Sequence, residues 1–200
     1  MSGTSMATPH VAGAIALVGQ RIKNDKAIFG DLSKEERGRL AKILLLNTSK
    51  PIKNPNGEYY AVRQQGSGLM DVFGATTTDT YVVEKTSGEA KAEVGSFKDN
   101  KITIDLTIFN KSKQNRRFNI HANALTDATA AANGYEFLLE QSRTIKGIEV
   151  SGGGDVIVPK LGKKDVRVTI DLTEAINSGE LKDQNFVEGF VFLDSKDSKV

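Results

Sequence analysis

The sequence predicts an α+β fold, with helices in the first third of the chain and an antiparallel β-sandwich in the rest. From Ala7 to Arg21, Ala, Val, Ile and Leu lie on every side of the expected helix, and such a helix is normally buried all round. After Thr76 apolar residues recur at every second position in short runs between turns, which is typical of a sandwich. We expect two domains, at residues 1–78 and 79–200.

Two helices are expected in the first part. The first covers Ala7 to Arg21, with Pro9 in its first turn, where a missing N–H costs little. The second covers Leu32 to Leu46. Ser33 and Glu36 have the spacing of a capping box, which marks its start. Its apolar side is formed by Leu40, Ile43, Leu44 and Leu46.

The strands of the second part follow from alternation and turn residues. Alternation is strict from Ile102 to Ile108, and Asp99-Asn100 predicts a hairpin between strands 91–97 and 101–109. Further strands are expected at 81–85, 117–125, 143–150, 155–159, 165–172 and 186–193.

Two other segments are expected to be helical, and ten side chains to be buried. Thr126 to Gly134 is rich in alanine and predicts a helical turn inside a long loop, and Thr173 to Ser178 predicts another. Phe190 and Phe192 share one strand parity whereas Val187 has the other, so we expect a bulge or burial on two sides near Glu188-Gly189. The ten side chains expected to be buried or partly buried are Ile102, Ile104, Leu106, Ile108, Val166, Val168, Ile170, Val187, Phe190 and Phe192.

Composition excludes several classes of site and partner. The 27 basic and 25 acidic residues leave a net charge of +2, which does not favour nucleic acid or a membrane surface. There is no cysteine, so neither a disulfide framework nor a thiolate metal site is possible. No apolar run reaches the length of a membrane span. We expect no cofactor and no metal.

The run Gly3-Thr4-Ser5-Met6-Ala7-Thr8-Pro9-His10-Val11-Ala12-Gly13 is the most informative feature. It resembles the segment around the nucleophilic serine of subtilisin-like serine peptidases, the subtilases. The resemblance implies that Ser5 is the nucleophile, that its backbone N–H helps to bind the oxyanion, and that Gly3 and Thr4 contact substrate. The alternative is that Ser5 is an ordinary serine at a helix start, which is common.

Two later regions resemble the same group of proteins. Gln65-Gly66-Ser67-Gly68, followed by Leu69 to Ala75, is similar to the Gly-x-Gly segment that opens the last helix of many subtilase domains. In the second part, Leu106 to Asn110 and Phe186 to Val191 resemble the fibronectin type III-like domain of cell-envelope proteinases. The implied fold is the helical C-terminal remnant of a subtilase α/β domain followed by a fibronectin type III-like sandwich. The implied location is extracellular or attached to the cell wall.

Neither histidine is expected to serve as the base for Ser5. His10 follows Ser5 by five residues on one helix and points well away from the hydroxyl, and His121 lies in a strand pattern. Asp25 and Asp31 could act as the triad acid only in a rearranged fold.

The triad aspartate and histidine are therefore absent from the chain, and the upstream part of the catalytic domain is a missing partner. We expect a parent endopeptidase that cleaves proteins or peptides through an acyl-enzyme on Ser5, and no useful activity from this chain alone. A non-enzymatic spacer or protein-binding module is the alternative. The helix from Ala7 leaves almost no polar face, which predicts self-association or disorder through about residue 30.

Overall fold

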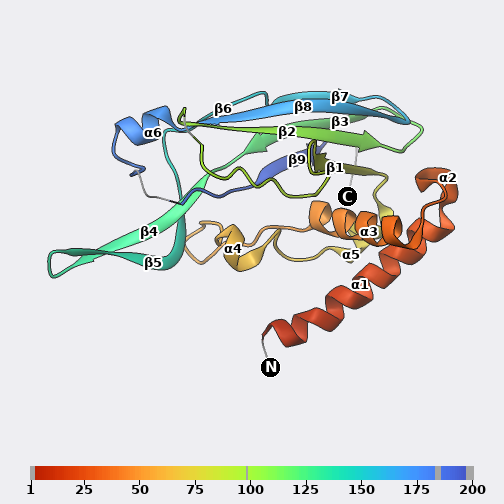
Figure 1. Ribbon diagram of the computed structural model, residues 1–200, viewed down its shortest axis with the longest axis horizontal. Coiled ribbons are helices and arrows are strands. Elements are labelled where there is room, and N and C mark those ends of the chain that lie inside the picture. The colour runs from red at the N-terminus through yellow and green to blue at the C-terminus, as the bar shows by residue number, and fades with distance from the viewer. Residues whose placement is uncertain (1–2, 98, 183–185, 197–200) are drawn as a thin grey trace.

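A computed structural model describes residues 3–97, 99–182 and 186–196. In Figure 1 the helices within residues 4–77 lie on one side of an antiparallel β-sandwich, and one long hairpin extends from the end of the sandwich. The expected α+β fold, with helices first and antiparallel sheets after them, is confirmed.

The first helix is longer than expected. α1 covers Thr4–Asn24, with Gly3 at its N-cap in a left-handed conformation (φ 134°). Pro9 thus lies in the second turn, not in the first. Pro9 cannot donate a bond to the Ser5 carbonyl, and the helix continues through it. A short helix, α2 (Lys26–Phe29), follows.

The capping box at the second long helix is confirmed. α3 covers Lys34–Thr48. The Glu36 N–H donates to the Ser33 hydroxyl at 3.1 Å, and the Ser33 N–H donates to the Glu36 carboxylate at 2.8 Å. Both bonds satisfy donors that the first helical turn leaves without partners.

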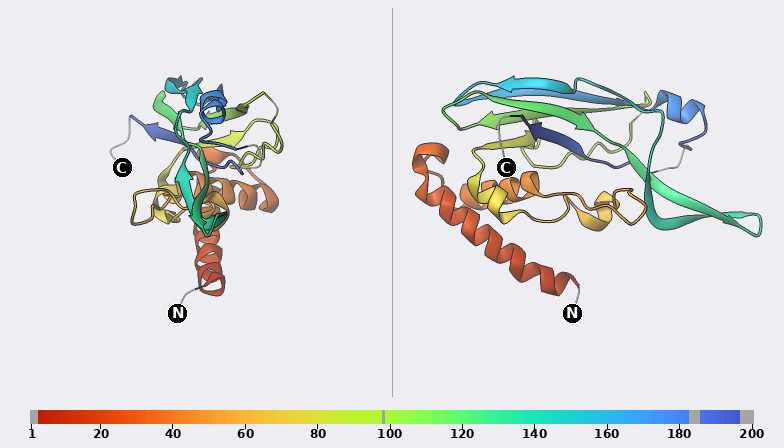
Figure 2. Two further views of the ribbon diagram at one scale, coloured as in Figure 1. Left: turned by 90° about the vertical axis from the view of Figure 1, so that its left-hand side faces the viewer. Right: turned by 180° about the vertical axis from the view of Figure 1, so that it is seen from behind.

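Two short helices complete the helical layer, and one face of α1 packs against it. α4 covers Val62–Gln65 and α5 covers Val72–Thr77. The buried core of this layer consists of Ala14, Val18, Ile22, Phe29, Leu40, Ala41, Leu44, Leu45 and Ala75. Only the second half of α1 contributes to it, and both views show the first half extending away from the body (Figures 1 and 2).

Two packed sheets form the sandwich. One has the order β1 (Thr80–Glu84), β2 (Lys101–Asn110), β8 (Gly162–Asp171), β6 (Glu149–Ser151), and the other has the order β7 (Gly154–Val158), β3 (Arg116–Ala122), β9 (Val191–Ser195). All ten side chains expected to be buried or partly buried are so.

The expected strand at 91–97 is wrong. Among the described residues, none between Glu84 and Lys101 is in a strand, so Asp99-Asn100 is not the turn of a hairpin. The physical reason is that both edges of β2 are already occupied, by β1 on one side and β8 on the other. The single strand expected at 143–150 is also wrong, because Gly147 (φ 71°) separates the end of one strand from β6.

The expected helical turn at Thr126–Gly134 is wrong as well. This segment belongs to a two-stranded ribbon, β4 (Leu125–Ala132) and β5 (Tyr135–Thr144). Asn133 and Gly134 both have positive φ (52° and 79°), as the turn of a two-residue hairpin requires. The second expected helical segment is confirmed as α6 (Thr173–Asn177).

Burial on two sides near Glu188-Gly189 is confirmed. Val187 packs on the cluster around α6, whereas the rings of Phe190 and Phe192 lie 5.7 and 5.8 Å from that of Tyr59. A Cβ on Gly189 would lie 2.3 Å from the Asn123 carbonyl oxygen, so only glycine fits at this position.

Candidate functional site

Gly3, Thr4 and Ser5 lie together at the exposed start of α1. Gly3 is the N-cap, and its carbonyl accepts from the N–H groups of Met6 (3.1 Å) and Ala7 (3.2 Å). The N–H groups of Thr4 and Ser5 precede these first helical bonds, so they point out of the helix end without an intrahelical partner. A helix N-terminus of this kind favours developing negative charge.

Ser5 has no base in the part of the chain that the structure describes. His10 Nδ1 donates to the Met6 carbonyl of its own helix at 2.8 Å. His121 lies in β3, stacked on Phe192, with its Nδ1 3.4 Å from an Asp194 carboxylate oxygen. Both histidines are thus engaged elsewhere.

The two candidate acids lie at the far end of α1. Asp25 is its C-cap and pairs with Arg21 at 3.4 Å, and Asp31 pairs with Lys26 at 2.8 Å. The hydrogen bond that Lys26 donates to Asp31 lowers the pKa of the Asp31 carboxyl. A helix of 21 residues places Asp25 about 30 Å from its start.

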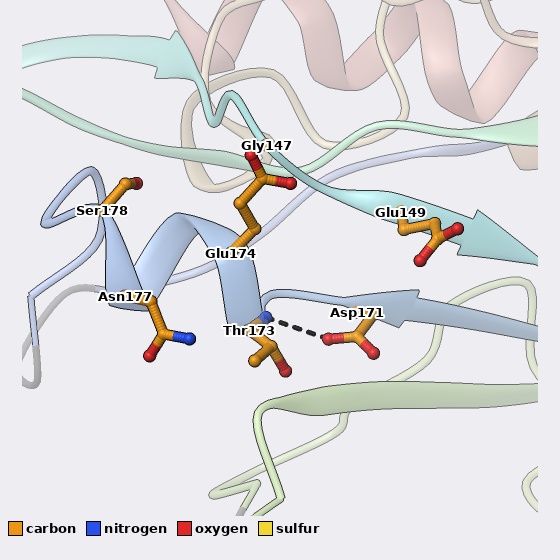
Figure 3. Close-up of a pocket in the computed structure, with 7 residues that line it drawn as sticks. All are labelled: Gly147, Glu149, Asp171, Thr173, Glu174, Asn177 and Ser178. Atoms are coloured by element: carbon orange, nitrogen blue, oxygen red, sulfur yellow. Dashed lines mark hydrogen bonds between the residues drawn. The ribbon is translucent and has the colours of Figure 1, made fainter.

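A hollow lies beside α6. Figure 3 shows its lining, which includes Glu149, Asp171 and Glu174. Asp171 accepts from the Thr173 N–H at 2.9 Å and forms an ion pair with Lys101. Its carboxylate therefore binds a backbone N–H of the first turn of α6. No group of three metal-ligating side chains occurs within residues 3–97, 99–182 and 186–196, and no helix there is long and apolar enough to cross a membrane.

Two family models match separate parts of the chain. Residues 92–200 match the Fn3-like domain model, and residues 1–76 match the subtilase family model. The chain belongs to the Fn3-like domain family, whose model covers more than half of it, and its first 76 residues are similar to the subtilase family. It combines a C-terminal portion of a subtilase domain, here called the subtilase region, with an Fn3-like domain.

Curated relatives match almost the whole chain. A PII-type proteinase of Lacticaseibacillus paracasei is 29% identical over 208 residues, which cover 98% of this chain and 11% of the relative. A C5a peptidase of Streptococcus pyogenes serotype M3 is 28% identical over 194 residues, 96% of this chain and 16% of the relative. The chain thus spans about a tenth to a sixth of the length of these relatives.

Sequence reasoning missed the contacts that join the subtilase region to the Fn3-like domain. The Arg63 guanidinium bonds to Glu188 at 2.7 Å and also to Asp127, while the Arg63 N–H donates to the second Glu188 oxygen at 3.0 Å. Glu58 accepts from the Thr144 N–H at 3.0 Å. The Ser142 hydroxyl donates to the Tyr59 carbonyl.

These residues lie 64 to 125 positions apart along the chain, so no local pattern could reveal them. One signal was available. Tyr59 and Tyr60 form an aromatic pair inside a polar turn segment, and a polar segment has little reason to carry large rings unless they pack on another element.

Proposed function

We propose that this chain is part of an extracellular, cell-wall-associated serine endopeptidase that cleaves proteins through an acyl-enzyme on Ser5. The observation that carries the proposal is the position of Ser5 in the first turn of α1, beside unpaired N–H groups and within a region that matches the subtilase family. The names of the relatives, a proteinase and a C5a peptidase, support protein as the substrate class.

In this proposal each residue of the helix start has a separate task. The Ser5 hydroxyl attacks the scissile carbonyl, and the Ser5 N–H helps to stabilise the oxyanion. Gly3 and Thr4 line the path of the substrate, where the absence of a side chain on Gly3 permits close approach. The base and the acid that activate Ser5 come from a part of the protein outside these 200 residues. We place the boundary between the two domains at residues 78 and 79, between the end of α5 and the start of β1.

The alternative is a non-enzymatic spacer or protein-binding module. The observation in its favour is that the Fn3-like match covers more than half of the chain. Activity of the longer protein decides between the two.

The test is Ser5→Ala in the longer protein that holds a complete subtilase-family domain. Turnover of a protein substrate should fall by several orders of magnitude, because the nucleophile is lost. Stability should change by no more than about 0.5 kcal/mol, since the side chain is exposed. Ser33→Ala is the matched control: it removes a helix cap, costs about 1 kcal/mol of stability and leaves turnover intact. Near-normal turnover in Ser5→Ala would reject the proposed nucleophile.

The 200-residue chain by itself should not hydrolyse casein or a chromogenic peptide. Serine is a weak nucleophile without an adjacent base, and both described histidines are bound elsewhere. A fluorophosphonate probe should leave Ser5 unlabelled in this chain and label it in the longer protein. Rapid stoichiometric labelling in the short chain would contradict the assignment of base and acid to the rest of the protein.

A further inference from the structure

The ribbon formed by β4 and β5 divides into a buried base and an exposed arm. At the base, Leu125, Thr126 and Ser142 are buried, and this end carries the contacts to the subtilase region. The arm, from Thr129 to Leu139, extends beyond the sandwich (Figures 1 and 2). Its large apolar side chains are open to solvent: Tyr135 is 70% exposed, Leu138 67% and Phe137 51%.

The register of the ribbon places Tyr135 and Phe137 on one face, whereas Leu138, which pairs with Thr129, lies on the other face. Ala132 pairs with Tyr135, and Ala130 pairs with Phe137. Cross-strand partners project from the same face, so two rings and two alanines lie on one side, with no charged residue among them. The alanines leave room for another surface to approach the rings closely.

Such an arm is poorly stabilised by itself. A two-stranded ribbon is marginally stable in water, and this one pairs with no other sheet within the described residues. Leaving several large apolar side chains in water also forfeits the free energy of their burial. Both facts indicate that the arm packs on something in the complete protein.

Continuity with the existing interface indicates what covers the arm. The base of the same ribbon is already fixed to the subtilase region, through Arg63 to Asp127, Glu58 to Thr144 and Tyr59 to Ser142. The subtilase region has open apolar side chains of its own, at Leu17, Leu69 and Phe73. The matched relatives are also about six to ten times longer than this chain.

We propose that the arm of the Fn3-like domain packs on the part of the subtilase-family domain that lies outside these 200 residues. Its partner is a folded, apolar protein surface, which the face of the arm that carries Tyr135 and Phe137 covers. The Fn3-like domain thereby contacts the subtilase-family domain through both parts of the ribbon, the charged base and the apolar arm.

Hydrogen exchange tests this directly. We compare the 200-residue chain with the longer protein that contains a complete subtilase-family domain, without substrate, at two concentrations. Amides of the arm should exchange at least tenfold more slowly in the longer protein. In the short chain they should exchange fast at both concentrations.

Phe137→Asp in the longer protein should abolish the added protection. Ile157→Asp is the matched control, because Ile157 is 59% exposed on β7 and away from the ribbon, and it should leave protection unchanged. Circular dichroism of Phe137→Asp in the short chain verifies that the variant folds.

Three outcomes would overturn the proposal. Protection that rises with concentration in the short chain would assign the arm to a second copy. Protection in the longer protein only after a protein substrate is added would assign it to substrate. Equal, fast exchange in both proteins would leave the arm without a docking role. None of these readouts depends on Ser5, so a failure here is distinct from a failure of the proposed activity.

Discussion

Gly66 and Gly68 lie two residues apart in one turn, and both have positive φ (60° and 103°), but their surroundings differ. A Cβ on Gly66 would meet nothing within 4 Å. On Gly68 it would lie 2.3 Å from the Lys50 carbonyl oxygen, because the chain bridges here to Lys50 through two backbone hydrogen bonds. Positive φ and the close Lys50 backbone both require glycine at position 68, whereas only positive φ requires it at position 66.

This pair predicts two different losses of stability. Gly66→Ala should cost about 1–2 kcal/mol, the cost of a left-handed conformation for alanine. Gly68→Ala should cost more than about 3 kcal/mol, since the backbone of Lys50 and Pro51 must also move. Urea unfolding of both variants measures the difference. Equal losses would show that the close approach at Gly68 relaxes at no cost.

At this scale the sequence predicted residues that act through their neighbours in the chain. Ser5 follows from an unbroken run of eleven residues, and Ser33 with Glu36 follows from capping-box spacing. Arg63 and Glu58 could not be predicted, because their partners lie on a ribbon that only the fold brings near.

At the scale of elements, the largest error lies in the β4–β5 ribbon. Alanine favours helix, so the alanine-rich segment from Thr126 to Gly134 predicts a helical turn. The local signal that wins is Asn133-Gly134, a hairpin turn, together with the ladder to Tyr135 and Phe137. Intrinsic preference is a weak guide where a turn already fixes how two segments pair.

The start of α6 predicts a dependence on pH. Hydrogen bonds from the side chain and backbone of Thr173, with help from Lys101, lower the pKa of Asp171 to about 2. Because the pKa is lower in the folded state, Asp171 stabilises the fold fully above about pH 4, and this stabilisation is lost as the pH falls towards 2.

The Asp171→Asn variant should therefore have a lower Tm than the wild type at pH 6. Between pH 4 and pH 2 its Tm should fall less than that of the wild type. Circular dichroism melts at steps of pH measure both. Glu149→Gln is the control, since Glu149 lines the same hollow beside α6 (Figure 3) and its replacement removes the same charge. Its melting curve should fall in parallel with that of the wild type. A parallel fall for Asp171→Asn too would contradict the role of Asp171.

At the scale of the whole molecule, the two halves of α1 differ in burial. Its second half is buried through Ala14, Val18 and Ile22, against the face of α3 that includes Leu40 and Leu44. This is one of the ways in which the sequence allows the helix to hide its apolar surface. Every described residue from Gly3 to Gly13 except Met6 is exposed.

The exposed apolar side chains of this region predict association between copies of the 200-residue chain. Val11 and Leu17 are 43% and 54% exposed on α1, and Leu69 and Phe73 are 65% and 69% exposed nearby in the helical layer. Burying a few such side chains yields several kcal/mol at roughly 25 cal/mol per Å². Light scattering should show a mass that rises with concentration, and Leu17→Glu with Val11→Glu should suppress the rise. Leu161→Asn, at a similarly exposed position in the turn between β7 and β8, should not.

Hydrogen exchange then separates the two halves of α1. Amides from Ala14 to Asn24 should be protected at every concentration, because their face is buried within one molecule. Amides from Thr4 to Gly13 should exchange fast in dilute solution and gain protection only as the copies associate. In the longer protein the same amides should be protected at any concentration, since the surface that α1 lacks here is then supplied within one chain. A chain that stays monomeric while Thr4 to Gly13 is strongly protected would contradict this account, because no described surface covers that half of the helix.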